Sequence, residues 1–237
     1  MLWYKGWLET RFRLLFTLGF IAFFMVTVQH SAQNSAASVP HASAAVLNAA
    51  TFGNAILLLM IYAMLAGAGI VTQPSFQAAK GIHGSTLFTL SLPVSRLRLL
   101  AVRAAIGWLE GAAEVAILCC GMWFLSPLIR RMATPTEMAE YAATLIVCGS
   151  ALYFLSVLLA TFLDDQWRVW GTMIAGAALF WLSRHVSLPA SIDIVQAIGK
   201  GSPLIAHAIP WAAMDFSLAL AAIFFFAALK VVQTREY

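Results

Sequence analysis

The most constraining feature of the sequence is a series of six long apolar runs, separated by short segments that hold most of the charged side chains. A helix that crosses the hydrocarbon core of a bilayer needs about 20 mostly apolar residues. The runs predict six membrane-spanning helices at residues 14–28, 51–72, 99–129, 138–163, 169–183 and 211–229. Residues 1–237 are therefore predicted to form one all-α integral membrane domain.

Composition supports the same class. Hydrophobic residues make up 62% of the chain and charged residues only 10%, far from the usual balance of a soluble domain. The net charge of +4 would suggest a nucleic-acid partner in a soluble chain, but basic residues beside membrane spans follow the positive-inside bias. We expect the lipid bilayer, and no nucleic acid, as a partner. Cys119, Cys120 and Cys148 lie in apolar runs without the spacing of metal ligands, and we expect them to be buried apolar side chains.

The distribution of Lys and Arg predicts the orientation. One side of the six-span arrangement holds Lys5, Arg11, Arg13, Lys80, Arg96, Arg98, Arg103, Arg168, Lys230 and Arg235; the other holds Arg130, Arg131, Arg184 and Lys200. This bias predicts that both termini are cytoplasmic. Asp164, Asp165, Trp167 and Arg168 are predicted to form a solvated cytoplasmic turn with an interfacial tryptophan.

The outer segment at residues 184–211 is too polar to span but carries two short helical patterns. Ser191 is predicted to cap the first helix, and residues 199–201 are predicted to end it. Ser202 and Pro203 together give a start signal for the second helix. The pattern predicts a re-entrant hairpin before the last span.

Motifs of soluble active sites are missing from the sequence. The nearest match to GxxxxGK[ST], IGKGSP at residues 198–203, lacks the hydroxyl residue after the lysine, and HExxH, GxSxG and the dinucleotide fingerprint do not occur. The five histidines are scattered. We expect no catalytic, cofactor-binding or metal-binding residues in this chain.

Two acidic residues within the third run are the exception. Glu110 and Glu114 are four residues apart and share one helix face. A carboxylate at that depth costs several kcal/mol, so the pair should point away from lipid. Gly107 and Gly111 lie near the same face as a GxxxG pattern that permits close packing. Two interpretations stay open: this face lines a polar translocation route or proton path, or the glutamates are neutral or hydrogen-bonded within a helix interface.

The segment between the second and third runs predicts a helix on the membrane surface. Gly81 and Gly84 break the chain, and Ser85 or Thr86 can begin a short helix with an apolar face. Pro93 prevents its simple continuation. Ser95 is placed to cap the helix that follows. Such an amphipathic element either lies in the headgroup layer or docks onto a partner.

At residues 90–96 the chain has LSLPVSR, which resembles the loop after the second span in membrane subunits of type-2 ATP-binding-cassette (ABC) exporters. Residues 3–15, WYKGWLETRFRLL, are similar to the amphipathic N-terminal helix of that family, and residues 235–237 look like its Arg-Asp-Leu ending. The resemblance implies a coupling helix at residues 85–95 that rests in a groove of a separate cytoplasmic ATPase subunit. The implied coupling interface consists of Ser85, Thr86, Leu87, Phe88, Leu90, Ser91, Leu92, Pro93, Ser95 and Arg96.

The resemblance also implies the assembly and its location. ATP and Mg²⁺ would be bound by the partner ATPase, and a second permease copy, in a homodimer or heterodimer, would complete the exporter in a bacterial inner membrane. The family usually carries acidic residues before and within the coupling helix, whereas this chain has Lys80, His83 and Leu87 there. This departure points to an apolar docking groove.

The leading hypothesis is a permease subunit that exports an amphiphilic substrate such as a drug, antibiotic, peptide or lipid. One alternative is an intramembrane enzyme that uses Glu110 and Glu114 as acid and base. Another is a membrane scaffold or sensor subunit without transport.

Overall fold

The computed structural model describes residues 2–36, 42–65, 95–163 and 165–234, and all regular structure in these ranges is helical. The long helices are α1 (Leu2–Ala36), α2 (Ala42–Leu65), α4 (Arg96–Leu125), α6 (Pro135–Leu159), α7 (Asp165–His185) and α10 (Trp211–Thr234). The short helices are α5 (Pro127–Met132), α8 (Ile194–Ile198) and α9 (Pro203–Ala206). The predicted all-helical class is confirmed for this part of the chain.

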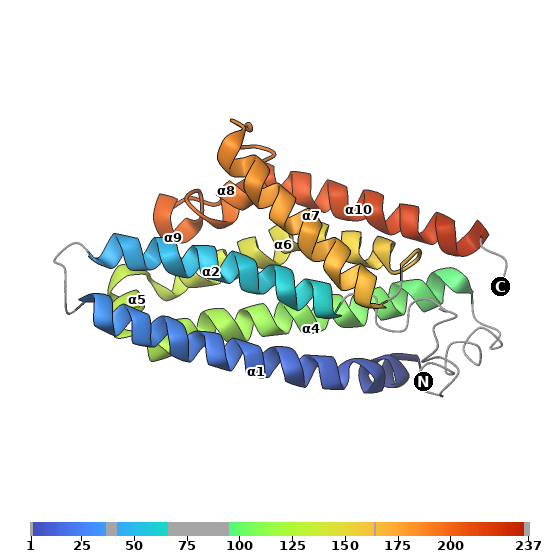
Figure 1. Ribbon diagram of the computed structural model, residues 1–237, viewed down its shortest axis with the longest axis horizontal. Coiled ribbons are helices and arrows are strands. Elements are labelled where there is room, and N and C mark those ends of the chain that lie inside the picture. Colours follow the sequence, from blue (N-terminus) through green and yellow to red (C-terminus); the bar gives the residue numbers. More distant parts are fainter. Residues whose placement is uncertain (1, 37–41, 66–94, 164, 235–237) are drawn as a thin grey trace.

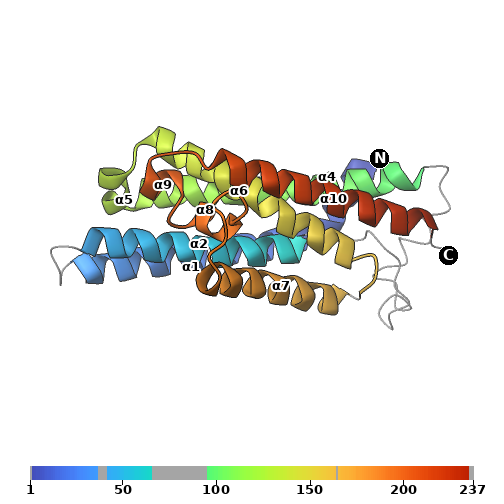
Figure 2. The same ribbon diagram turned by 90° about the horizontal axis from the view of Figure 1, so that it is seen from above.

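The long helices lie lengthwise in one bundle, and α7 crosses the others obliquely (Figure 1). The first turns of α1 and α4 and the last turn of α10 lie at one end of the bundle (Figure 1). Helices α5, α8 and α9 lie toward the other end in both views (Figures 1 and 2). Segments predicted to share a side of the membrane therefore share an end of the bundle.

Four of the described helices are long and apolar enough to cross a membrane: Thr10–Thr27 within α1, and α4, α6 and α10. Helix α2 contributes a shorter apolar stretch, Gly53–Leu65. Helix α7 carries the predicted span at 169–183 but is not among the four, because polar and charged residues occupy both of its ends. The chain is a multi-pass helical membrane protein, and the count of six spans stays a prediction.

The end of the third run and the cap of α8 differ from their predictions. The third run is not one helix through residue 129, because α4 ends at Leu125 and α5 begins at Pro127. Ser126 lies at the break, where its Oγ accepts a hydrogen bond from the Ile129 amide at 3.4 Å. Proline has no N–H with which to continue the α4 hydrogen-bond ladder.

The cap of α8 is the second difference. Asp193, and not the predicted Ser191, caps this helix, since its Oδ1 accepts a hydrogen bond from the Gln196 amide at 2.9 Å. The other signals in the segment are confirmed: Gly199 ends α8, and Pro203 is the first residue of α9. Both helices are short, and their depth in the bilayer stays a prediction.

Helix α6 lies at the centre of the bundle. It contacts α2, α4, α7 and α10, with its most extensive contact on α10. Its Tyr141, Cys148 and Tyr153 side chains are completely buried. Gly149 on the same helix faces the ring of Tyr62 from α2, so the absence of a side chain at this position permits close packing.

Replacing Gly149 by alanine should destabilise the protein. The added Cβ would collide with the Tyr62 ring and lie 2.9 Å from Leu58 Cδ2, and both of these side chains are buried. Overpacking of this kind costs about 1–3 kcal/mol, and we expect a lower melting temperature in detergent. Gly19→Ala is the matched control, because nothing lies within 4 Å of its added Cβ. An equal effect of the two substitutions would contradict this packing.

Candidate functional site

Two carboxylates lie on the face of α4 that packs against α1. Glu110 is 9% exposed and Glu114 is fully buried, so both lie inside the bundle. The Thr10 hydroxyl of α1 donates to Glu110 Oε1, and the Thr17 hydroxyl donates to Glu114 Oε1, each at 2.5 Å. Two polar pairs therefore join α1 to α4 within apolar surroundings.

Each threonine hydroxyl has a second acceptor within its own helix. Thr10 Oγ1 lies 3.2 Å from the Trp7 carbonyl, and Thr17 Oγ1 lies 2.8 Å from the Arg13 carbonyl. A hydroxyl has one proton to donate and can also accept. It donates to the glutamate when the carboxyl is ionised, and to the carbonyl when a protonated carboxyl donates to the hydroxyl. The pairs thus accommodate either protonation state.

The second oxygen of each carboxyl has no such partner. Oε2 of Glu110 and Oε2 of Glu114 are buried without a hydrogen bond in the part of the chain that the structure describes. Leaving a buried polar atom unpaired costs about 1–3 kcal/mol, and more when it is charged. Both interpretations from the sequence therefore stay open. The contacts of Oε1 fit a helix interface, whereas Oε2 is able to accept a proton or a polar ligand, as a translocation route or proton path would require.

Glycines on α4 make room for two tyrosines near the acids. A Cβ on Gly107 would lie 2.6 Å from Tyr153 Oη, and one on Gly111 would lie 2.5 Å from Tyr62 Cε1. The two tyrosine rings meet edge to face, with their centroids 5.6 Å apart. Tyr153 Oη donates to the Ala104 carbonyl of α4 at 2.7 Å. The GxxxG pair therefore seats aromatic side chains against α4.

Arg168 does not lie in a solvated turn, and that prediction was wrong. Its side chain is fully buried, and Nη1 donates to the Ala63 carbonyl at 2.6 Å and to Ser156 Oγ at 3.0 Å. Ala63 lies in the last described turn of α2, so Arg168 joins α7 to α2 through a backbone carbonyl. The neighbouring Trp167 is 66% exposed, in agreement with an interfacial position.

The structure describes only the last two residues of the implied coupling interface. Residues 85–93 lie outside the described residues, whereas Ser95 and Arg96 lie within them. Ser95 caps α4 as predicted, since its Oγ accepts a hydrogen bond from the Arg98 amide at 3.3 Å. Arg96 Nη1 donates to the carbonyls of Val232 at 3.0 Å and Gln233 at 3.3 Å, in the last turn of α10. A cation at that end also complements the helix dipole.

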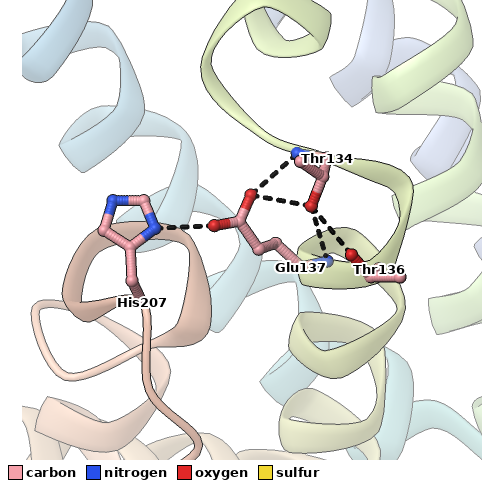
Figure 3. Close-up of polar contacts among 4 residues, drawn as sticks. All are labelled: Thr134, Thr136, Glu137 and His207. Atoms are coloured by element: carbon pink, nitrogen blue, oxygen red, sulfur yellow. Dashed lines mark hydrogen bonds and ion pairs between the residues drawn. The ribbon is translucent and has the colours of Figure 1, made fainter.

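A second polar cluster lies where α6 begins (Figure 3). Glu137 Oε2 accepts a hydrogen bond from the Thr134 amide at 2.8 Å, and the Glu137 amide donates to Thr134 Oγ1 at 3.2 Å, which forms a capping box. Glu137 Oε1 lies 2.6 Å from His207 Nδ1. His207 has φ 50°, the left-handed region that non-glycine residues seldom adopt. This contact ties the connection between α9 and α10 to α6.

In the described part of the chain, the cysteines and the potential metal ligands do not cluster. Cys119 and Cys148 are buried as predicted, but the prediction was wrong for Cys120, which is exposed. Successive residues of a helix point about 100° apart, so the neighbours 119 and 120 need not share an environment. Among the described residues, no group of three or more His, Cys, Asp or Glu side chains is placed to hold a metal ion.

Thr10 and Thr17 were not predicted as partners of the acids. Their signal is a spacing of seven residues, two helical turns, which places both hydroxyls on one face of an otherwise apolar helix. Comparison with known proteins gives no further guide, because no protein-family model, curated protein or solved structure matches the chain.

Thr17→Val should destabilise the fold by about 1–3 kcal/mol, because it leaves Glu114 without its hydroxyl partner. Thr27→Val is the matched control, since the Thr27 hydroxyl is exposed and bonds only within its own helix among the described contacts. We expect the control to change the free energy of unfolding in mixed micelles by less than about 0.5 kcal/mol. Thr17→Val should become nearly neutral in a Glu114→Leu background, and additive losses would contradict the pairing.

Proposed function

We propose that the protein is the membrane permease subunit of an ATP-driven exporter that moves an amphiphilic substrate, such as a drug, antibiotic, peptide or lipid. The observation that carries the proposal is the LSLPVSR segment at residues 90–96, directly before α4, which resembles the coupling loop of type-2 ABC permeases. The short helices α8 and α9 ahead of α10 support it, because the family carries a re-entrant hairpin in this place.

The contacts of α4 suggest how force would travel. ATP binding would close two partner ATPases and push on residues 85–95, and α4 begins at the next residue. Arg96 would pass the movement to the last turn of α10. The pairs of Glu110 and Glu114 with α1 would make α1 follow α4. Such a unit rocks between inward-facing and outward-facing states.

The proposal includes the rest of the assembly. A cytoplasmic ABC ATPase supplies the nucleotide site with ATP and Mg²⁺, and a second permease copy completes the exporter in a bacterial inner membrane with cytoplasmic termini. Lys80 and His83 replace the usual acidic residues, so docking uses the apolar residues of the coupling segment. The exposed Phe12, Phe16 and Phe23 of α1 give it an apolar outer face suited to lipid or to the second copy.

The contacts of the glutamates favour transport over the enzyme alternative. Glu110 and Glu114 are held by hydroxyls of α1 at one oxygen each, an arrangement that suits a helix connection or a proton site. Two carboxylates on one helix without a nucleophile or metal ligands make a poor catalytic constellation. A scaffold or sensor subunit would share the fold but would not support transport.

Leu90→Ala should uncouple the exporter. The chain is co-expressed with the protein of a neighbouring reading frame that carries GxxxxGK[ST], and ATP-dependent export is measured in inside-out vesicles. We expect export and stimulated ATP hydrolysis to fall about tenfold, since a buried interface leucine is worth on the order of 1–2 kcal/mol. Leu97→Ala is the control, because Leu97 is an exposed leucine outside the implied interface. Unchanged export in both Leu90→Ala and Pro93→Ala would contradict the proposal.

Glu114→Gln should impair export without preventing assembly. Glutamine keeps the oxygen that accepts from Thr17 but cannot take up or release a proton. Co-purification of the ATPase and ATP-dependent export are measured on the same membranes. Normal export would show that the acid serves the helix interface alone.

A further inference from the structure

A cavity of about 660 Å³ lies between α6, α7 and α10, beside α8. Its walls are apolar side chains of the three long helices and of residues 188–195, among them Ala151, Ala178 and Leu220. Helices α6 and α10 are two of the four that are able to cross a membrane. Ile174 of α7 and Ile223 of α10 are more than half exposed, so apolar surface surrounds the cavity.

One charged side chain, Asp193, belongs to the lining, and it is already engaged. Its Oδ1 accepts from the Gln196 amide at 2.9 Å, and its Oδ2 accepts from Ser183 Oγ at 2.8 Å. Only 4% of the residue is exposed. Because buried polar groups need hydrogen-bond partners, the part of a ligand that enters this cavity has to be apolar.

An aromatic residue of the lining, Trp181, has basic neighbours on α7. Trp181 lines the cavity, is 60% exposed and stacks on His185, with the ring centroids 4.8 Å apart. His185 Nδ1 lies 2.8 Å from the Trp181 carbonyl, which only accepts, so this nitrogen carries a proton. Arg184 is exposed in the same turn. Tryptophan with basic residues is typical of the membrane interface, where they meet lipid phosphates.

We propose that this cavity binds one acyl chain of a membrane phospholipid with an anionic head group, whose phosphate lies at Arg184. The guanidinium charge complements the phosphate, and the apolar interior complements the chain. A peptide segment fits less well, because its N–H and C=O groups would enter without partners. The proposal does not depend on the exporter function.

The test counts the lipids that the full chain keeps. The protein is reconstituted in vesicles of equal parts phosphatidylglycerol and phosphatidylcholine, extracted in mild detergent and measured by native mass spectrometry. The wild type should keep one phosphatidylglycerol per chain. Ala178→Phe should lower this occupancy about tenfold, because excluding two methylene groups costs roughly that factor. Ala177→Phe is the matched control, since Ala177 is exposed and outside the lining.

Arg184→Gln should keep one lipid per chain but lose the preference for phosphatidylglycerol. Equal retention by Ala178→Phe and Ala177→Phe, or no preference in the wild type, overturns the proposal. If Ala178→Phe proves unstable, the wild type is instead labelled with phosphatidylglycerol that carries a photoreactive acyl chain, and the labelled helices are identified. Labelling of α6, α7 and α10 supports the site. Labelling confined to other helices, or a cross-link to a second copy across the cavity, overturns it.

Discussion

The burial of two carboxyl groups within an apolar bundle is the constraint on which the helix arrangement depends. Glu110 and Glu114 cannot face lipid, so the face of α4 that carries them needs a neighbour with hydroxyl groups. Helix α1 supplies Thr10 and Thr17 at that face. Arg13 of α1 also donates to the Met64 carbonyl of α2 at 3.3 Å. Apolar contacts give α1 little further preference, because lipid solvates apolar side chains equally well. Polar pairing therefore fixes where α1 lies.

Charged side chains of opposite sign bond the helix backbone at the two ends of the bundle. At one end, Arg96 and Arg168 donate to carbonyl groups in the last described turns of α10 and α2. Toward the other end, Glu137 and Asp193 accept from the first amides of α6 and α8 or from their caps. In each case a charged side chain bonds backbone groups in or beside the first or last described turn of a helix. In our proposal, Arg96 also joins the coupling segment to α10.

Local sequence patterns predicted the helices, whereas contacts between residues far apart in the sequence determine the surroundings of Glu110, Glu114 and Arg168. Apolar run length and the Ser95 cap depend on a few neighbouring residues, so the sequence alone indicated them. The hydroxyl partner of Glu110 is 100 residues away and the carbonyl partner of Arg168 is 105 residues away, beyond any local pattern. The cap of α8 also has a partner outside its own helix, since Asp193 accepts from Ser183 of α7.

The central claim is that residues 85–95 dock onto an ATPase, and site-specific photo-cross-linking tests it most directly. A photoreactive phenylalanine analogue replaces Phe88, and in a second variant it replaces Trp211, an exposed aromatic residue at the start of α10. We predict that position 88 cross-links to a protein carrying GxxxxGK[ST] and that position 211 does not. The absence of this adduct at position 88, or equal capture at both positions, would contradict the account.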